Sequence, residues 1–346
     1  MTGFHKPAST ALDPLLQRFM HIDFKSMRPK GFNTVIGADI RQCCDRVDRG
    51  RGWRRIESCP NCGSKESRTL LTRFGRGLKQ CSNCTLGYME HFPVSTADLI
   101  GETDYAYLQE KAYLRNAEYR KERFGKERLE LIEQFLPVDP RNATLLDVGC
   151  GTGWFLESAI ERGYTVEGVE FARELARITS ERIDVPITSM PLDEFKGSDR
   201  FDVITMFDVL EHVENPQEVL GSIHRLLKPG GVGMIFVPNL ESLGNYVLGA
   251  NSNLIMPAEH LFQFTRKSLS MMLSKASLEI LKFSTNGMDI ADIAAYMRDE
   301  AEKPEVFEFL VDNVDILQAI VDSSGFANHM RFIVRKDQSP PRLAGS

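Results

Sequence analysis

Four of the seven cysteines form two identical pairs whose spacing is typical of zinc ligands. Cys59 and Cys62 make the first C-x2-C pair, and Cys81 and Cys84 make the second. Each pair brings two thiolates to one side of an ion, and two facing pairs complete a tetrahedral shell. Four protein ligands leave no position for water, so we expect a structural zinc ion. The intervening sequence predicts a hairpin of two short strands around residues 74–77.

A second chemical signal is a glycine-rich turn that follows an apolar run. The run at residues 144–148 is typical of a buried parallel strand, and a helical pattern follows at residues 154–162. Glycines at the turn let the backbone bend sharply and let a ligand approach without meeting a Cβ atom. The residues that form this signal are Asp147, Gly149, Cys150, Gly151 and Gly153.

The next predicted strand, at residues 165–169, ends in an acid, Glu170. In doubly wound folds an acid at this place accepts hydrogen bonds from ribose hydroxyls, so the unit is expected to bind a nucleoside. The glycines fall as G-x-G-x-G and are preceded by Asp147, whereas a dinucleotide site has G-x-G-x-x-G. This pattern favours a ligand with a positive amino group over one with a pyrophosphate.

From about residue 142 to residue 336 the chain resembles the class I S-adenosylmethionine-dependent methyltransferases. Further landmarks at residues 191–195, 201–213 and 226–231 follow the family's order of third-strand loop, fourth strand and fifth-strand entry. The resemblance implies an α/β fold: a seven-stranded Rossmann-like sheet whose last strand is antiparallel. The segment 259–265 looks like a narrower subgroup, in which a zinc ribbon precedes the methyltransferase body and the substrates are sugars or glycan precursors.

The resemblance also assigns roles around the cofactor. Asp147 and the amides of residues 149–153 are expected at its amino acid end, and Glu170 on its ribose. Cys150 is expected only to fill the turn, because methyl transfer from a sulfonium needs no enzyme thiol. The other expected contacts are Phe171 on the adenine face, Leu192 and Asp193 at the adenine edge, and the backbone near Phe207 and Asp208 at the methionine amine.

The acceptor must lose a proton if it is a hydroxyl or a carbon acid, so we expect a base near the strand ends. His260 is the leading candidate, with Glu259 beside it, against an alternative role in anchoring its loop. His212 is weighed as a catalytic residue against a helix-capping or packing histidine. Pro257 stands where the resembling sugar C-methyltransferases have tyrosine, which leaves oxygen methylation open. The tyrosines weighed as a cover for the cofactor, against core packing, are Tyr105, Tyr107, Tyr113 and Tyr119.

These groups must be positioned by a conventional globular chain. Its 346 residues, 42% hydrophobic and 26% charged, have ordinary globular composition. Further strands are expected at residues 231–237, 277–284 and 329–336, and the acidic stretch 289–324 is interpreted as a helix covering the sheet, a lid or an oligomer contact. The predicted divisions are a basic extension (1–57), a zinc ribbon (58–90), a helical linker or lid (91–140), the cofactor-binding domain (141–336) and a tail (337–346).

Charge and targeting signals limit the partners. Residues 1–86 contain 16 Lys/Arg and 7 Asp/Glu, in a chain whose net charge is −6. The arginines at residues 46–55 are interpreted as a solvated basic surface rather than a nucleic-acid site, and Cys43 and Cys44 as ordinary thiols. The sequence contains no apolar run long enough for a membrane helix and no visible secretory signal, so a cytoplasmic location is expected.

Three functions remain in competition at this point. The first is methyl transfer from S-adenosylmethionine to a hydroxyl or carbon of a small molecule, a sugar or a phosphate-bearing precursor. The second is an RNA methyltransferase that grips RNA through the ribbon and the basic head. The third is a catalytically silent zinc-binding module, which the intact Asp147, glycines and Glu170 disfavour. Acceptor identity and oligomeric state are not predicted.

Overall fold

The central element is a seven-stranded sheet in the order β12-β13-β10-β9-β6-β7-β8. Adjacent strands from β8 to β10 are parallel, whereas β13 is antiparallel to both of its neighbours. The α/β fold with an antiparallel last strand is therefore confirmed. The strands are β6 (Thr144–Val148), β7 (Thr165–Val169), β8 (Ile187–Thr188), β9 (Phe201–Phe207), β10 (Leu227–Pro238), β12 (Leu278–Asn286) and β13 (His329–Lys336).

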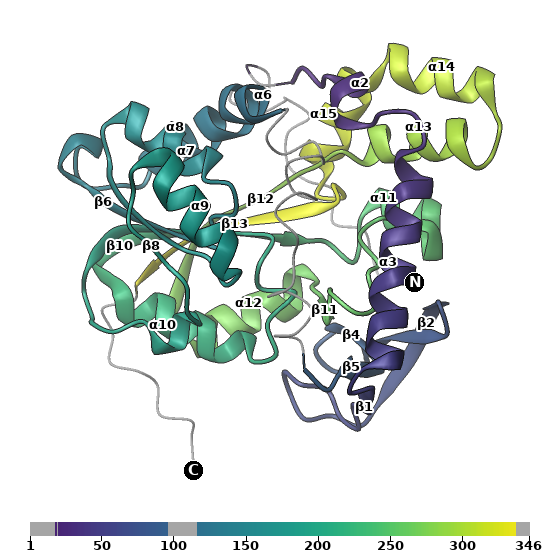
Figure 1. Cartoon of the computed structure of the whole chain (residues 1–346), viewed down its shortest axis with the longest axis horizontal. Coiled ribbons are helices and arrows are strands. Elements are labelled where there is room, and N and C mark those ends of the chain that lie inside the picture. The colour runs from purple at the N-terminus through teal and green to yellow at the C-terminus, as the bar shows by residue number, and fades with distance from the viewer. Residues whose placement is uncertain (1–17, 19, 96–115, 337–346) are drawn as a thin grey trace.

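The computed structural model describes residues 18, 20–95 and 116–336. Helices cover both faces of the sheet, as the apolar, continuously buried strands β6 and β9 require. In Figure 1, α7, α8 and α9 lie on one face, and α10 and α12 lie on the other. These helices are α7 (Lys126–Glu133), α8 (Trp154–Arg162), α9 (Arg173–Ile183), α10 (Pro216–Leu226) and α12 (Arg266–Lys275). No helix within the described ranges is long and apolar enough to cross a membrane.

The cysteine-rich part forms small antiparallel sheets. The predicted hairpin is present as β2 (Ser67–Arg73) and β3 (Arg76–Cys81), and β4 (Gly87–Met89) pairs with β3. A fourth strand, β11 (Phe262–Gln263), comes from beyond His260 and pairs with β4. The ribbon sheet therefore includes a strand of the chain that follows the predicted catalytic loop. A two-stranded sheet of β1 (Trp53–Arg55) and β5 (His91–Pro93) lies beside it (Figure 1).

The N-terminal segment forms a long helix that the sequence analysis did not anticipate. The helix α3 (Phe32–Arg49) follows the short α2 (Phe24–Met27). Its buried residues recur at helical spacing and are Ile40, Cys43, Cys44 and Val47. In Figure 1, α3 runs from the ribbon part to α13, across one end of the central sheet.

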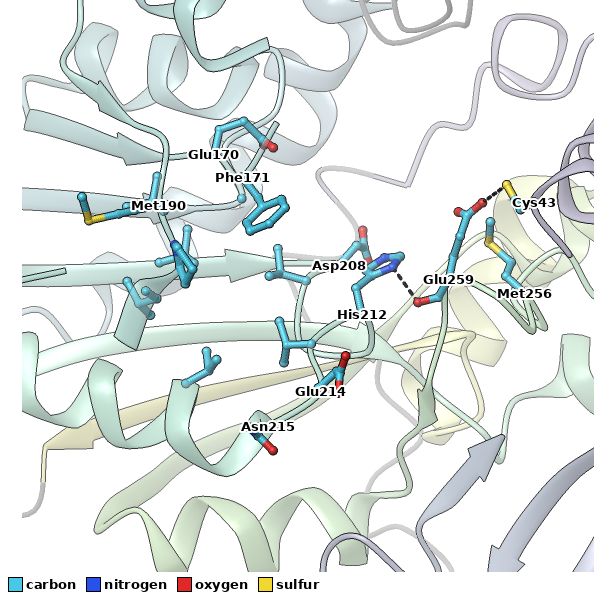
Figure 2. Close-up of a pocket in the computed structure, with 18 of the residues that line it drawn as sticks. Cys43, Glu170, Phe171, Met190, Asp208, His212, Glu214, Asn215, Met256 and Glu259 are labelled. Carbon is cyan, nitrogen blue, oxygen red and sulfur yellow. Dashed lines mark hydrogen bonds between the residues drawn. The ribbon is translucent and has the colours of Figure 1, made fainter. Parts of the chain in front are cut away.

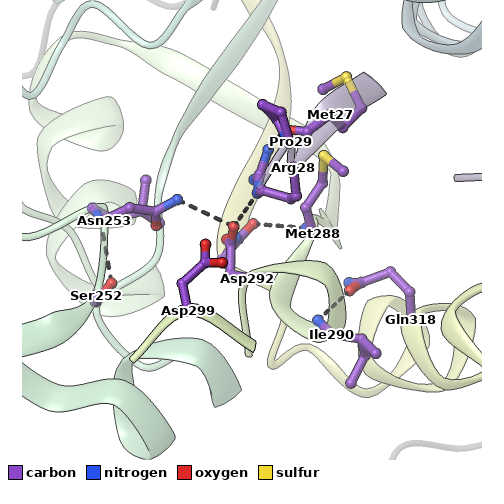
Figure 3. A network of polar contacts seen from close by, with 12 residues as sticks. Met27, Arg28, Pro29, Ser252, Asn253, Met288, Ile290, Asp292, Asp299 and Gln318 are labelled. Atoms are coloured by element: carbon purple, nitrogen blue, oxygen red, sulfur yellow. Dashed lines mark hydrogen bonds and ion pairs between the residues drawn. The ribbon is translucent and has the colours of Figure 1, made fainter. Parts of the chain in front are cut away.

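The acidic stretch 289–324 forms three helices, which are α13 (Asp289–Asp299), α14 (Pro304–Asp312) and α15 (Val314–Ser324). Buried acids of this stretch are held by polar partners. The guanidinium of Arg28 donates to Asp292, which also accepts from Asn253 (Figure 3). This contact fixes the N-terminal segment on the helical part. The remaining helices are α6 (Ala117–Arg120), a π-helical turn (Lys121–Gly125) and α11 (Leu243–Leu248).

Candidate active site

A cavity of about 870 Å³ lies at the carboxyl ends of the parallel strands. This is the edge at which open α/β sheets bind their ligands. Its wall brings together the glycine turn, the ends of β7 and β9, the loop before β11, and helix α3. The predicted site residues that line it are Gly149, Glu170, Phe171, Leu192, Asp193, Asp208, His212 and Glu259. Figure 2 shows Phe171 and Glu170 on one side of this space and His212 and Glu259 on the other.

The glycine turn has the conformation that its sequence predicts. Gly149, Gly151 and Gly153 all have φ between 52° and 74°, a region that favours glycine. At Gly149 a Cβ atom would lie 2.2 Å from Val209, so the close approach of the next loop also requires glycine. Helix α8 begins directly after Gly153. The turn meets the cavity at Gly149, whose amide donates to the carbonyl of Val169 at 2.7 Å.

Two buried acids flank this turn. Asp147 is 3% exposed and accepts a hydrogen bond from the Thr205 hydroxyl at 2.7 Å. Burial, assisted by the negative charge of Glu170, raises the pKa of Asp147 to about 7. Glu170 accepts hydrogen bonds from the amides of Gly151 and Ala172, each at 2.9 Å, and burial raises its pKa. The acid at the end of β7 therefore braces the glycine turn that it adjoins.

Other predicted cofactor residues divide into those on the cavity and those behind it. Phe171 keeps 37% of its surface exposed and lies at the cavity wall near Leu192, which is on a single 3-10 turn. Cys150 is buried, and its Sγ packs so closely on Gly168 that a Cβ there would lie 2.9 Å from it. Phe207 packs against Phe155, with 4.8 Å between ring centres.

Asp208 occupies an unusual backbone position at the end of β9. Its φ is 55°, a conformation that costs a non-glycine residue energy and often marks a functional site. One carboxylate oxygen lies 3.1 Å from Nε2 of His329. Burial opposes ionisation, but His329 and Arg128 together lower the pKa of Asp208. The cavity therefore keeps a negative charge at this point.

Arg128 is a buried cation beside the end of β9 that the sequence analysis did not anticipate, and it is not among the residues that line the cavity. It lies on α7, is 7% exposed, and stacks its guanidinium 4.1 Å from the ring centre of Phe207. It forms no hydrogen bond or ion pair with any residue that the structure describes. Burial lowers its pKa to about 10, so it remains a cation at neutral pH, influenced by Asp208 and Glu127. No motif surrounds Arg128, so only the fold reveals its place.

Of the four tyrosines weighed as a cover for the cofactor, the structure describes Tyr119. The Tyr119 hydroxyl donates to the carbonyl of His21 at 3.1 Å and accepts from the amide of Asp23 at 3.2 Å. Tyr119 thus packs in the N-terminal region and is not among the residues that line the cavity. Tyr105, Tyr107 and Tyr113 lie outside the described residues.

On the acceptor side the two histidines lie in contact. The rings of His212 and His260 are edge-on, with centres 4.7 Å apart. Nδ1 of His212 faces the carbonyl of Glu259 at 3.0 Å, and Nδ1 of His260 faces the carbonyl of Leu254 at 2.8 Å. His212 lines the cavity, whereas His260 lies behind it and is 6% exposed. Burial and the neighbouring His212 lower the pKa of His260 to about 3, so this ring is neutral.

Glu211 adjoins this pair and was not predicted as a site residue. It is fully buried, and neither carboxylate oxygen has a hydrogen-bond partner among the described residues. Burial, and then the charge of Asp208, raise its pKa well above the ordinary value. The pattern Glu-His at residues 211–212, directly after a strand, was the signal that would have identified it.

Helix α3 supplies a wall that sequence reasoning also missed. The Cys43 thiol donates to a carboxylate oxygen of Glu259 at 2.8 Å (Figure 2). Burial, followed by the charge of Glu259, raises the pKa of Cys43 to about 12, so the thiol is protonated. Glu259 is therefore held from both sides, by the thiol at its carboxylate and by His212 at its carbonyl. The other α3 residues on the cavity are Ile36, Asp39, Ile40, Gln42 and Arg46.

The cavity is rich in carboxylates. Its acidic residues are Asp39, Glu170, Asp193, Asp208, Glu214, Glu218 and Glu259, and Arg46 is the one Lys or Arg side chain among the described lining residues. Such a wall favours a cationic ligand such as a sulfonium. Two arginines of the basic head form ion pairs with acids, Arg54 with Glu214 and Arg76 with Asp48.

The four predicted zinc ligands converge away from this cavity. The Sγ atoms of Cys59, Cys62, Cys81 and Cys84 all lie within 4.8 Å of one another. Their chemistry suits a closed four-thiolate zinc site. The cluster is joined to the predicted catalytic loop through β11 and β4, and by a hydrogen bond from the amide of Met89 to the carbonyl of Leu261 at 3.0 Å.

Comparison with known proteins identifies the part of the chain that contains the cavity. Residues 117–282 match the family model described as a methyltransferase domain. These residues are therefore similar to a methyltransferase domain. The wall of the cavity also includes helix α3, which lies outside the matched residues.

Curated relatives match parts of the chain. The ubiquinone biosynthesis O-methyltransferase of Hydrogenovibrio crunogenus is 31% identical over 111 residues, which are 30% of this chain and 45% of that protein. That of Alkalilimnicola ehrlichii is 32% identical over 130 residues, 36% of this chain and 50% of that protein. The chain thus spans about half the length of these relatives. A solved S-adenosylmethionine-dependent methyltransferase from Archaeoglobus fulgidus is similar at 19% identity and a TM-score of 0.47, with 67% of this chain and all of that one covered; this likeness is too distant to bear on function.

Proposed function

We propose that the protein transfers a methyl group from S-adenosylmethionine to a hydroxyl oxygen of a small molecule. The observation that supports this most directly is the single cavity that joins the glycine turn and Glu170 at one end to His212 and Glu259 at the other. Its volume is within the range of sites for drug-sized ligands. The O-methyltransferase names of the partial relatives favour oxygen as the acceptor atom. The departure at Pro257 from the sugar C-methyltransferase pattern agrees with that choice.

In this proposal the cofactor lies along the glycine turn. The backbone of residues 149–153 and Asp147 lie at its amino acid end, and Arg128 pairs with its carboxylate, because this buried guanidinium has no ion-pair partner among the described residues. The ribose hydroxyls bind Glu170, and the adenine stacks on Phe171. Leu192 and Asp193 border the adenine, and the backbone near Phe207 and Asp208 faces the methionine amine.

The acceptor occupies the rest of the cavity, between Phe171 and helix α3. The reaction is a displacement in which an O–CH3 bond forms as the C–S bond breaks, so the protein contributes alignment and exclusion of water. The acceptor hydroxyl must also lose its proton. We assign this task to the buried cluster of Glu211, His212 and His260, with Glu259 positioning His212 through its carbonyl.

The class of acceptor is narrowed by charge. A sugar hydroxyl suits the polar carboxylate-rich wall, because carboxylates accept hydrogen bonds from hydroxyls. A phosphate-bearing sugar would meet these carboxylates, with Arg46 as the one Lys or Arg among the described lining residues. We therefore favour a neutral polyhydroxylated acceptor.

We also propose that the four-cysteine cluster holds a structural zinc ion. The ion would hold together a short ribbon whose buried side chains, such as Leu78 and Leu86, belong to the core of the larger sheet. Through β4 and β11 it would also fix the chain that follows Glu259 and His260.

A cofactor titration and a labelling experiment test the proposal. The protein should bind S-adenosylmethionine with one site per chain, measured by calorimetry. Incubation with methyl-labelled cofactor and fractionated cell extract should place label in the small-molecule fraction, as an ether stable to mild base. Label in RNA, or no cofactor binding, would contradict the proposed function. A salt-independent activity would further disfavour RNA.

A further inference from the structure

Three potential metal ligands meet behind the acceptor wall, outside the cysteine cluster. One carboxylate oxygen of Glu211 and one ring nitrogen each of His212 and His260 all lie within 4.8 Å of one another. Glu211 and His212 come from the loop after β9, and His260 comes from the loop before β11. Two histidines and one carboxylate are a common ligand set for divalent transition metals.

The orientation of the two rings fits shared ligation of one ion. Both Nδ1 atoms face backbone carbonyls, of Glu259 and Leu254, so Nε2 is the nitrogen left for a ligand in each ring. A second hydrogen bond of this kind is the usual support of a metal-bound histidine. Two imidazoles bound to one ion at ~2.1 Å and ~90–110° apart would have ring centres roughly 4.5–5.2 Å apart. The observed separation is 4.7 Å.

The buried carboxylate supplies the second, independent observation. Glu211 is fully buried, and neither of its oxygens has a hydrogen-bond partner among the described residues. An isolated buried carboxylate is costly unless it takes up a proton, a counter-ion or a metal. No lysine or arginine of the described chain forms an ion pair with it.

We propose that Glu211, His212 and His260 bind one divalent transition-metal ion, of the Mn(II), Fe(II), Co(II) or Zn(II) class. Three protein ligands leave coordination positions open, and His212 lines the cavity, so the open side faces the acceptor. This inference rests on the proposed function for its role. An acceptor hydroxyl bound to the ion would lose its proton more readily, and the proton would pass to a cavity carboxylate such as Glu259. The oxygen then forms the O–CH3 bond, the C–S bond breaks, and S-adenosylhomocysteine leaves with the electron pair on sulfur.

The test uses Mn(II) as the probe, with the full chain carrying its ribbon zinc. Mn(II) prefers oxygen and nitrogen ligands to thiolates, so the four cysteines should not compete for it. Electron paramagnetic resonance of free Mn(II) measures binding directly, without any methyl transfer. We expect one bound ion per chain with a Kd below about 100 µM, and pulsed spectra should show coupling to histidine nitrogen.

Variants then locate the ion. Glu211→Gln and His260→Gln should each weaken Mn(II) binding at least tenfold, whereas Glu218→Gln, an exposed acid on the same cavity, should leave it unchanged. Absence of Mn(II) binding by the wild-type protein would overturn the inference, as would bound Mn(II) without nitrogen coupling. Equal losses in Glu218→Gln would show that the acidic cavity wall binds the ion instead. The nitrogen coupling is measured on the wild-type protein. The inference can therefore be contradicted even if the Glu211→Gln protein does not fold.

The metal-binding inference and the proposed methyl transfer can be contradicted independently of each other. If the protein binds S-adenosylmethionine and methylates an acceptor in the presence of a chelator that removes Mn(II), only the metal inference is wrong. If Mn(II) binds at the cluster but S-adenosylmethionine does not bind, only the proposed function is wrong.

Discussion

The cofactor end and the acceptor end of the cavity are built in different ways. The cofactor end is nearly continuous in sequence: the glycine turn and Glu170 lie within 25 residues, and the Glu170 carboxylate bonds the Gly151 amide across 19 of them. The acceptor end is assembled from distant segments, as in the Cys43–Glu259 hydrogen bond, which joins residues 216 apart. The first end depends on local backbone geometry, whereas the second depends on how α3, the β9 loop and the ribbon pack together. Changes at the two ends should therefore have separable effects.

The largest separable effect is expected at the acceptor end. His260→Ala should lower turnover by roughly 100-fold or more while the Kd for S-adenosylmethionine stays the same, because the ring serves proton removal and not cofactor binding. Steady-state kinetics and calorimetry measure the two quantities. His21→Ala, an exposed histidine, is the matched control. Near-normal turnover of the His260 variant would remove the cluster from catalysis.

The second effect is expected at the cofactor end. Arg128→Ala should weaken S-adenosylmethionine binding by about 10- to 100-fold, because a charge-assisted hydrogen bond is worth about 1.5–3 kcal/mol. Turnover at saturating cofactor should fall much less. Arg177→Ala, on the surface of α9 and paired with Glu174, serves as control. A large loss of turnover at saturating cofactor, with unchanged affinity for S-adenosylmethionine, would contradict the assignment of Arg128 to cofactor binding.

A third substitution, in the ribbon, should lower turnover through the acceptor end and leave cofactor binding at the other end nearly unchanged. Cys62→Ser removes one thiolate of the cluster, so we expect loss of zinc and, through β4 and β11, about tenfold lower turnover. Cofactor affinity should change little, because the glycine turn follows β6 of the central sheet and the cysteines belong to the separate ribbon part. Metal analysis, kinetics and calorimetry together check this. Cys44→Ser, a buried thiol outside the cluster, should retain the zinc; equal zinc loss there would refute the assignment of ligands.

The smallest effect concerns pH at the cofactor end. In the cofactor-free protein the pKa of Asp147 is raised to about 7, and the cofactor ammonium should favour its ionised form. Binding therefore releases a proton below pH 7, and affinity should rise about threefold to tenfold from pH 6 to pH 7 and then level off. Asp147→Asn should flatten this dependence. A wild-type affinity that falls with pH in this range would contradict the assignment.

The ribbon illustrates why some predictions are secure and others are not. The C-x2-C spacing and the hairpin between the pairs are local, and the structure brings the four Sγ atoms together as expected. The pairing of β4 with β11 was invisible, because two short strands more than 170 residues apart leave no mutual pattern in a single sequence. The ribbon's connection to the predicted catalytic loop is thus a product of tertiary structure.

The sequence by itself determined the parts that rest on short-range geometry. Buried strands require apolar runs, a sharp turn requires glycines, and the last strand was placed at residues 329–336, as observed. Helix α3 has an apolar spacing that would have identified it, but its place over the cavity would have remained unknown. Tertiary structure alone decided that Arg128 is a buried cation without an ion pair to any described residue, and that Glu211 lies beside two histidines. Such facts depend on burial and proximity between distant segments, which determine the charge and ligand properties of a side chain more than its sequence neighbours do.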